Sequence, residues 1–576
     1  MKHAAPALLF ALSLSPLPAA QDTLVKDINP PYGAASDHSY PQRFQALREK
    51  LIFAAIRNDV GQEIWASDGT EEGTLLLKDI HPTTSSQPHD LTLFRDRVLF
   101  LAFDDANAEL WSTNGTELGT EHVADVGPDA QTSTGPMIAA SDYAIFFVET
   151  PGDNEIWRTD GTAAGTQPVT TFGSLDFNID LGVLQDEVYF TQQTGGGEGH
   201  NGLWKTDGTA GGTVHVKQPW EGIGGSPRDF TAAGDYLFFT ATTSLGKELW
   251  RTDGTAEGTI LLKDIDPGSS GSDPQDLVAL DDGLLLFSAS SASLSRSIWK
   301  SDGTPAGTEL LFSPPPLSSN ANSLVSFGDE AWFQVPWFFE DSELWRTDGT
   351  AAGTYEIAKS VSFTGDFHAV GSGQRIVWTG FVSGAGATGD EPFLSDGTTA
   401  GTVLVSDVYP GSDDSLPGGY TRAGNKVFFT ANDGVHSIEL HAFDLTDFGG
   451  WVAEPFGVGC GVASAPELKL SGELLTGAPV ALELEGSAPL APVVFYTSPV
   501  SAQDVIGPCN NYLAQPLLLA TAATDAGGAL SLHAAVPSDP GVVGAFLVVQ
   551  SATVVAGGPF LGVAEFSNGL ELVVGP

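Results

Sequence analysis

Aspartate is the residue type whose repeated placement in this sequence points to chemistry. It recurs at the end of a short apolar segment, directly before a polar loop, at Asp27, Asp79, Asp125, Asp264 and Asp407. Calcium is a hard cation that takes about six to eight oxygen ligands, so these five residues are candidate calcium ligands. The alternative is that each carboxylate caps the following loop through local hydrogen bonds. No loop has the ligand spacing of an EF-hand, and both readings stay open.

Known catalytic sequence motifs are missing from the sequence. It contains no G-x-S-x-G segment, no H-E-x-x-H segment and no phosphate-binding glycine loop. The 11 histidines are scattered, with His81 and His89 in one loop and His436 and His441 in another segment. Carboxylate pairs discriminate nothing, because 72 residues are Asp or Glu. The sequence therefore identifies no catalytic and no cofactor-binding residue, which favours a non-catalytic protein and leaves enzymatic activity open.

The charge balance restricts the partners. Only 24 residues are Lys or Arg, which leaves a formal net charge of -48. Nucleic acids and anionic membrane faces are bound through basic patches, so a chain this acidic is not expected to bind either. The acidity also keeps a large surface soluble.

The N-terminal segment is typical of a secretory signal peptide. Lys2 and His3 precede an apolar run at 7–14, and Ala19 and Ala20 provide a small-residue cleavage site. The run is too short to span a membrane. We therefore expect residues 1–20 to be removed, and the mature protein to be secreted or displayed at the cell surface without inserting into the membrane.

The candidate aspartates are placed by a repeat. A twelve-residue phrase, ELWRTDGTAEGT at 248–259, has seven near-copies, and successive copies lie 46 to 49 residues apart. The aromatic residue of each copy falls at Trp65, Trp111, Trp157, Trp204, Trp250, Trp299, Trp345 and Phe393. A fixed period of this length indicates a repeat architecture.

Each period contains four strand-like segments. A short segment such as Leu277–Leu280 precedes an aromatic-rich run such as Leu237–Ala241, which is followed by the Glu-Leu-Trp segment and then by one such as Ile260–Ile265. Four short strands, here a to d, make one β-propeller blade. The Asp-Gly-Thr sequence predicts the turn between strands c and d, with Gly at positive φ and Asp capping its own turn. The Trp is expected to wedge between neighbouring blades.

The ends of the repeat region predict how the ring closes. Thr23–Ile28 resembles an isolated strand d, whereas the last unit has Val427–Ala431 and Ile438–Phe443 as strands b and c but no clear d. The two parts add to one composite blade, which removes open sheet edges. We therefore predict an all-β fold with a propeller of about nine four-stranded blades over residues 21–446, closed by the N-terminal strand. Eight blades is the fallback.

The phrase also resembles a known family. ELWRTDGT at 248–255 and at 343–350, with the trailing Gly-Thr, is similar to the ELWxxDGT repeat of large exported bacterial proteins, over about residues 22–445. The resemblance implies a secreted repeat protein with a propeller-like β structure. It transfers no catalytic residue, because the family carries none that is established. The copies depart from the pattern at Gly202, Ser297 and Pro392-Phe393.

The region from 451 to 576 differs in composition. It contains one Lys, no Arg and no copy of the phrase, and the alternation at Val480–Leu484 predicts a small β-sandwich. In an oxidising compartment Cys460 and Cys509, the only cysteines, are expected to form a disulfide. Segments 457–461 (GVGCG) and 567–574 (SNGLELVV) resemble a C-terminal β domain of exported planctomycete-type proteins, which implies an accessory role in surface display or sorting.

Function is expected at the irregular loops. The d–a crossovers, such as His81–Asp90 and Asp266–Asp276, lie with the b–c turns at the end of the ring opposite the Asp-Gly-Thr turns, and variable loops on a rigid scaffold are common binding sites. We expect a monomeric, non-catalytic binding or adhesion scaffold for an extracellular protein or glycan. One alternative is an extracellular hydrolase or lyase with its site at the channel mouth, which a convergent charged cluster there would favour. The other is a structural envelope or matrix component, with calcium setting its rigidity.

Overall fold

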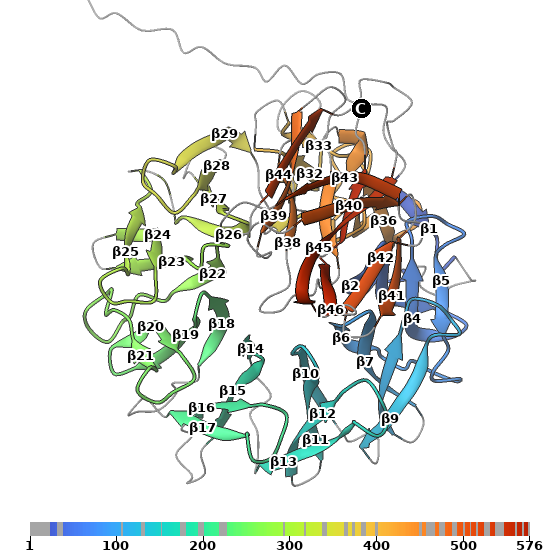
Figure 1. Ribbon diagram of the computed structural model, residues 1–576, viewed down its shortest axis with the longest axis horizontal. Helices are drawn as coiled ribbons and strands as arrows, with labels where there is room; N and C mark the ends of the chain where they lie inside the picture. The colour runs from blue at the N-terminus through green and yellow to red at the C-terminus, as the bar shows by residue number, and fades with distance from the viewer. Residues whose placement is uncertain are drawn as a thin grey trace, which may run out of the picture.

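The repeated segments fold into nine four-stranded antiparallel sheets arranged in a ring, as predicted (Figure 1). The computed structural model describes residues 23–448, except 31–37, 105–106, 128–132, 151–152, 173–179, 194–200, 218–226, 292–293, 316–317, 319, 337–341, 362–366, 371–374, 382–387 and 398–400. Beyond 448 it describes only the backbone of the strands. The described residues contain no α-helix, and one 3-10 turn, η1 (Leu445–Phe448), follows the last blade.

Each blade runs from strand a at the centre of the ring to strand d at its rim (Figure 1). The strands of blades 1 to 3 are β2 (Gln42–Leu47), β3 (Lys50–Arg57), β4 (Gly61–Ser67), β5 (Leu75–Lys78); β6 (His89–Phe94), β7 (Arg97–Phe103), β8 (Ala108–Thr113), β9 (Glu121–Gly127); and β10 (Ser133–Ala139), β11 (Ala144–Thr150), β12 (Asp153–Thr159), β13 (Gln167–Phe172). Those of blades 4 to 6 are β14 (Leu181–Leu184), β15 (Glu187–Gln193), β16 (Asn201–Thr206), β17 (Val214–Lys217); β18 (Arg228–Ala233), β19 (Tyr236–Thr243), β20 (Gly246–Thr252), β21 (Ile260–Leu261); and β22 (Gln275–Ala279), β23 (Leu285–Ser291), β24 (Leu294–Ser301), β25 (Glu309–Phe312).

The ring closes through the N-terminal strand. Blades 7 and 8 are β26 (Asn322–Phe327), β27 (Glu330–Val335), β28 (Ser342–Thr347), β29 (Tyr355–Val361); and β30 (His368–Ala369), β31 (Ile376–Gly380), β32 (Glu391–Ser395), β33 (Val403–Leu404). Blade 9 combines β34 (Gly418–Ala423), β35 (Lys426–Asn432) and β36 (Ile438–Asp444) with β1 (Leu24–Lys26), which pairs antiparallel with β36. The predicted composite ninth blade is confirmed, and the eight-blade fallback is wrong because no unit is left outside the ring.

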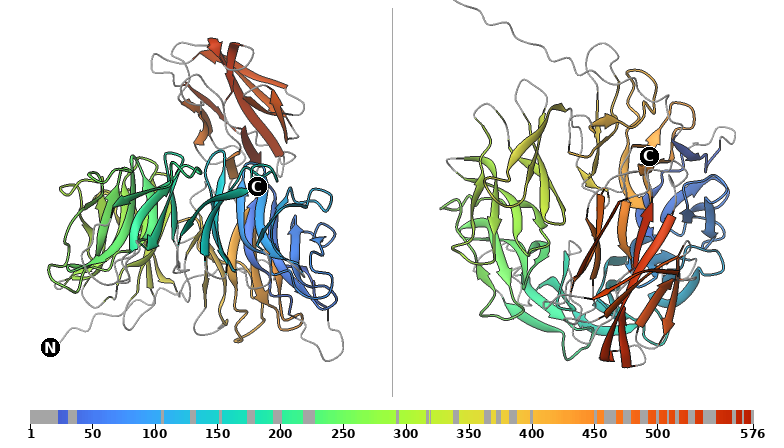
Figure 2. Two further views of the ribbon diagram at one scale, coloured as in Figure 1. Left: turned by 90° about the horizontal axis from the view of Figure 1, so that it is seen from below. Right: turned by 45° about the horizontal axis from the view of Figure 1, so that its top comes forward.

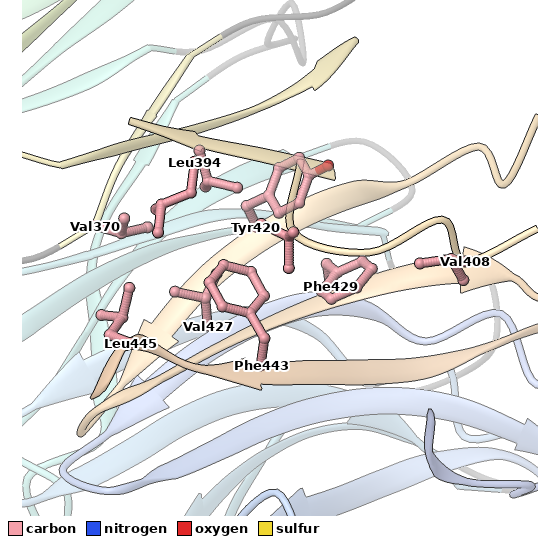
Figure 3. Close-up of a cluster of buried hydrophobic side chains, with 11 residues drawn as sticks. Val370, Leu394, Val408, Tyr420, Val427, Phe429, Phe443 and Leu445 are labelled. Atoms are coloured by element: carbon pink, nitrogen blue, oxygen red, sulfur yellow. The ribbon is translucent and has the colours of Figure 1, made fainter. Parts of the chain in front are cut away.

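The aromatic residue of the phrase packs between blades, as predicted. Trp111 of blade 2 belongs to one core cluster with Ile52 and Ile64 of blade 1, and Trp299 of blade 6 contacts a cluster that includes Leu249 of blade 5. Figure 3 shows the corresponding cluster between blades 8 and 9, where Leu394 and Val370 meet Val427 and Phe443. Burial of these large apolar surfaces joins each blade to the preceding one.

The Asp-Gly-Thr segment forms a compact loop that is longer than a two-residue hairpin. In blade 5, Asp253 Oδ1 accepts hydrogen bonds from the amide and the hydroxyl of Thr255, and the hydroxyls of Thr252 and Thr259 lie 2.8 Å apart across the base of the loop. Gly254 has φ of +89°, and a Cβ there would lie 2.5 Å from Tyr189 Oη of blade 4. Glycine is therefore required both by the backbone and by the neighbouring blade.

Three lysines at or near the end of strand d, Lys26, Lys217 and Lys263, each bond to the Asp-Gly-Thr loop of the following blade. Lys217 Nζ of blade 4 donates to the carbonyls of Thr259 (2.5 Å) and Ala256 (2.8 Å) in blade 5. Lys26, on the closing strand β1, makes the same contact with Thr74 of blade 1 at 2.9 Å. These cations satisfy carbonyls that the loop leaves without a backbone partner.

The C-terminal region is also built of β-strands. They are β37 (Val452–Phe456), β38 (Glu467–Ser471), β39 (Pro479–Glu485), β40 (Pro492–Ser498), β41 (Ser501–Ile506), β42 (Cys509–Leu513), β43 (Leu517–Ala523), β44 (Leu530–Ala535), β45 (Phe546–Gly558), β46 (Gly562–Phe566) and β47 (Gly569–Val573). They form antiparallel sheets of six, three and two strands. Among the described residues, no helix has the length and apolar character needed to cross a membrane.

Candidate functional site

The two ends of the ring differ in their chemistry. Because the blades are antiparallel, strands a and c all begin at the end of the ring that carries the crossovers. The uniform Asp-Gly-Thr loops lie at the other end. Figure 2 shows the ring edge-on, with the strands crossing its thickness. The inner strands contact one another in sequence around the ring, from β2 with β6 to β26 with β30, and β2 also contacts β34. The start of each inner strand therefore lies near the centre of one end of the ring, which we call the mouth.

A β-bulge marks this mouth in most blades. The register of the inner strand shifts near its start, and among the described residues the bulge carries a left-handed backbone at Arg43, Asp90, Asp229, Asp276, Ser323 and Gly419. Bulges turn a strand and re-aim a side chain, and they are frequent next to functional sites. We refer to the five non-glycine members, Arg43, Asp90, Asp229, Asp276 and Ser323, as the entrance residues.

The entrance residues keep a side chain at a strained position. A left-handed non-glycine residue costs on the order of 1 kcal/mol, and Gly419 shows that blade 9 avoids this cost. Sequence analysis missed these residues, although a signal exists. Most of them follow a proline by two positions, as in Pro88-His89-Asp90, and directly precede a large apolar residue.

Three neighbouring inner strands bring one polar cluster together at this mouth. His89 on β6 bonds across the blade boundary, with Nε2 2.6 Å from Thr134 Oγ1 on β10, while Nδ1 lies 2.9 Å from the Gln87 carbonyl oxygen. Asp90 Oδ2 lies 3.9 Å from His89 Nε2, and the exposed Arg43 on β2 acts on both groups electrostatically. Burial lowers the pKa of His89, so the imidazole is neutral at neutral pH.

A second cluster links blades 5 and 6. Lys247 Nζ lies 3.3 Å from Asp229 Oδ2 and 3.4 Å from Asp273 Oδ1, and Arg296 Nη2 lies 2.8 Å from Asp273 Oδ2. Asp276 Oδ2 accepts a hydrogen bond from Ser288 Oγ at 3.0 Å. The charges of this cluster largely pair with one another, so it presents a fixed pattern of donors and acceptors rather than one free charge.

A glutamate on strand c, which begins most copies of the phrase and stands at the equivalent position 439 in blade 9, is a further buried polar group whose role the sequence did not indicate. Glu439 is fully buried and accepts hydrogen bonds from the amides of Ile28 and Ser39, both 3.1 Å, and from Ser39 Oγ at 2.5 Å. Burial raises its pKa to about 8, against the opposing effect of these donors. The same cage of two amides and a serine hydroxyl surrounds three other carboxylates of the ring, those of Glu63, Glu248 and Glu391.

The predicted calcium ligands are placed next to these cages. Asp27, Asp79 and Asp407 lie close enough to Glu439, Glu63 and Glu391, respectively, for their negative charges to raise the pKa of those carboxyls. Asp264 directly precedes Ile265, whose amide faces Glu248. Asp407 Oδ2 also accepts a hydrogen bond from the Gly411 amide at 3.3 Å, which is the loop-capping alternative. Calcium at these four positions stays a prediction.

Asp125 has different surroundings. Within the described part of the chain, Glu109, His122 and Asp125 form the one group of three potential metal ligands, with ligand atoms within 4.8 Å of one another. Sequence analysis singled out Asp125 but missed Glu109 and His122.

The predicted signal peptide and Cys460 lie outside the described residues, and the structure describes only the backbone at Cys509. The disulfide therefore stays a prediction.

Comparison with known proteins yields fold neighbours only. No family model and no curated relative matches the sequence. Solved structures with some likeness include oligopeptidase B from Leishmania major (12% identity, TM-score 0.38, 70% of this chain and 54% of that chain). Others are the β-propeller domain of the trilobed protease from Pyrococcus furiosus (9%, 0.31, 57% and 98%) and a eukaryotic initiation factor (11%, 0.42, 62% and 88%). This chain also spans only 55% of the prolyl endopeptidases that it resembles. TM-scores this low carry no argument about function.

Proposed function

We propose that this protein is a secreted, non-catalytic binding scaffold that recognises an extracellular protein or glycan at the crossover end of the propeller. The observation that carries the proposal is the difference between the two ends of the ring. The Asp-Gly-Thr loops repeat one structure, whereas the entrance residues present Arg, Asp and Ser side chains at equivalent bulges. A rigid scaffold with varied side chains at one mouth suits recognition.

The pairing of charges further supports binding over catalysis. The two nitrogens of His89 both lie within hydrogen-bond distance of oxygen atoms, and Lys247 and Arg296 are engaged by Asp229 and Asp273. Groups fixed in this way orient a ligand, because their own positions need no reorganisation on binding. The similarity of the phrase to the ELWxxDGT repeat of exported proteins and the signal-like N-terminus agree with an extracellular role, which we include in the proposal.

The test screens the purified full chain against glycan and extracellular-protein arrays and then measures the affinity of any hit. Arg43→Gly removes the exposed cation and, as at Gly419, relieves the left-handed backbone. We expect it to weaken binding about tenfold or more without lowering the melting temperature. Glu117→Ala, in the exposed Asn-Gly-Thr loop of blade 2 at the other end, is the matched control and should bind as the wild type. Equal effects of the two changes, or no binding on either array, would contradict the proposal.

The hydrolase alternative rests on one contact, between His89 and Thr134. If Nδ1–H donates to the Gln87 carbonyl, Nε2 is left to accept the Thr134 hydroxyl proton, as a general base does for a nucleophile. Asp90 and Arg43 place further charge beside the pair. Turnover of an ester, peptide or glycoside by the wild type that Thr134→Ala abolishes would replace the binding proposal with this one.

A further inference from the structure

The two outer strands of blade 2 bring together three side chains with metal-binding atoms. Glu109 on β8 lies opposite Asp125 on β9, and Trp111 lies opposite His122. Bulges at both points bring the imidazole towards the two carboxylates. His122 Nε2 lies 2.9 Å from Asp125 Oδ1 and 3.7 Å from Glu109 Oε1. The three ligand atoms therefore face a common point between strands c and d.

Among the described side chains, Glu109 has different partners from the caged glutamates. In blades 1, 5, 8 and 9 the equivalent carboxylate accepts backbone amides and a serine hydroxyl on both oxygens. Within the described residues, Glu109 has no amide donor of this kind. Its Oε2 accepts the Trp111 indole N–H at 2.8 Å, which orients the carboxylate and leaves Oε1 directed at His122. A buried carboxylate oxygen that faces an imidazole is an arrangement that a cation would satisfy.

The other blades show that this combination is specific to blade 2. The position of His122 opposite the tryptophan is taken by Leu76, Leu261 and Leu310 in blades 1, 5 and 6. Blade 4 has a histidine there, His215, but Gly202 replaces its glutamate. The repeat thus provides blades that have the carboxylate without the imidazole and a blade that has the imidazole without the carboxylate.

We propose that Glu109, His122 and Asp125 bind one Zn²⁺ ion, with water completing the coordination. One imidazole nitrogen and two carboxylate oxygens form a donor set that zinc accepts, whereas calcium takes oxygen ligands. The side chains of His122 and Asp125 are 40% and 60% exposed, so an ion reaches them from solvent, while Glu109 is 9% exposed and fixes the inner side. At Asp125 the proposed zinc site replaces the calcium site that was one of the two readings of the sequence.

The experiment uses the full chain after treatment with a chelator and titrates it with ZnCl₂ by calorimetry. We expect His122→Ala to lose one zinc equivalent or to bind it at least about tenfold more weakly, and Asp125→Asn to weaken it in the same direction. His215→Ala, at the equivalent position of blade 4, is the matched control and should retain the wild-type stoichiometry. CaCl₂ should not compete for the site.

The fold of the variants is checked separately. Thermal unfolding without metal should give His122→Ala and His215→Ala melting points close to that of the wild type, because both histidines lie at the rim. Zinc should raise the melting temperature of the wild type and His215→Ala but not that of His122→Ala. No zinc binding by the wild type, or the same binding by His122→Ala, would overturn the proposal and leave only the hydrogen bond between His122 and Asp125.

Discussion

At the scale of single residues, the Glu of the phrase has two different environments. In blades 1, 5 and 8 the crossover amides and a serine surround the carboxylate, as the amides of Ile80 and Ser86 and the Ser86 hydroxyl do at Glu63. In blades 2, 3 and 7 the indole N–H of the nearby tryptophan donates to it instead, as Trp157 does to Glu155 at 2.8 Å. A buried carboxylate needs donors, and each blade that has the glutamate supplies one set or the other.

The caged carboxyls should make stability depend on pH. Burial raises the pKa of Glu439 from 4.5 to about 8 and that of Glu391 to about 7. Between the unfolded and folded pKa values the folded chain binds more protons, so the stabilising contribution is complete below about pH 4.5 and is lost as the pH rises through the folded pKa. We expect the free energy of unfolding to fall between pH 5 and pH 8, by at most about 1.4 kcal/mol per pH unit for each group.

Denaturant unfolding of the wild type and of Glu439→Gln across this range measures the effect. The variant removes the titrating group, so its free energy of unfolding should fall less steeply with pH. The variant is expected to be less stable than the wild type at every pH, because its amide has one acceptor oxygen for three donors. Glu117→Gln, an exposed control, should follow the wild-type slope. An unchanged slope in Glu439→Gln would show that the cage keeps the carboxylate charged.

At the scale of elements, strands b and c carry one Phe–Trp pair in register in blades 1 to 8, whereas in blade 9 Phe429 lies opposite His441. Phe239 lies opposite Trp250 in blade 5, and the same order holds in the other blades that contain the tryptophan. Blade 8 reverses the order, with Trp378 on strand b and Phe393 on strand c. The departure that the sequence shows at Phe393 is thus compensated on the opposite strand, because the core between blades has to be filled.

This compensation is testable in blade 8. Trp378→Phe should leave a cavity and cost about 1–3 kcal/mol, and Phe393→Trp should overpack the interface at a similar cost. The double variant restores the order of the other blades, so its cost should be below the sum of the two by about 1 kcal/mol or more. Thermal or urea unfolding gives the three values, and strict additivity would show that the two rings do not share one space.

At the scale of the whole molecule, the ring depends on contacts between the ends of the repeat region. Leu24 and Lys26 pair with β36, Thr23 Oγ1 lies 3.0 Å from His441 Nδ1, and Val25 packs in one cluster with Trp65 of blade 1 and Leu440 of blade 9. Without this strand, blade 9 would have an open edge at the rim. A β1 segment of three residues thus completes a sheet assembled from positions more than 400 residues apart.

Disruption of the closing strand should loosen the molecule as a whole. Val25→Asp places a charge in the buried cluster and is expected to cost about 3 kcal/mol or more. Limited proteolysis and small-angle scattering should show faster cleavage and a larger radius of gyration than for the wild type. Val435→Asp, at an exposed position of the same blade, is the control and should change neither. Wild-type cleavage rates in Val25→Asp would argue that the blade contacts alone hold the ring closed.

The sequence by itself determined the four-stranded blade, the number of blades and the way the ring closes. The spacing of the Trp residues, the Asp-Gly-Thr turns and the split ninth unit are local patterns, and local backbone and side-chain preferences decide them. The roles of Glu109 and Glu439 could not be read in the same way, since equivalent glutamates of strand c acquire different partners: Trp111 is two residues from Glu109, whereas Ser39 at Glu439 comes from the other end of the repeat region.

The tertiary structure decided which polar groups meet. His89 and Thr134 lie in adjacent blades, Arg43 and Asp90 lie at the same mouth, and His122 meets Glu109 because strands c and d pair with two bulges. The repeat period places every copy at the same height in the ring, but the contacts of a side chain depend on the neighbouring blade and on the register of its own sheet. Both are set by packing across the whole ring, which is why the candidate sites emerged only from the structure.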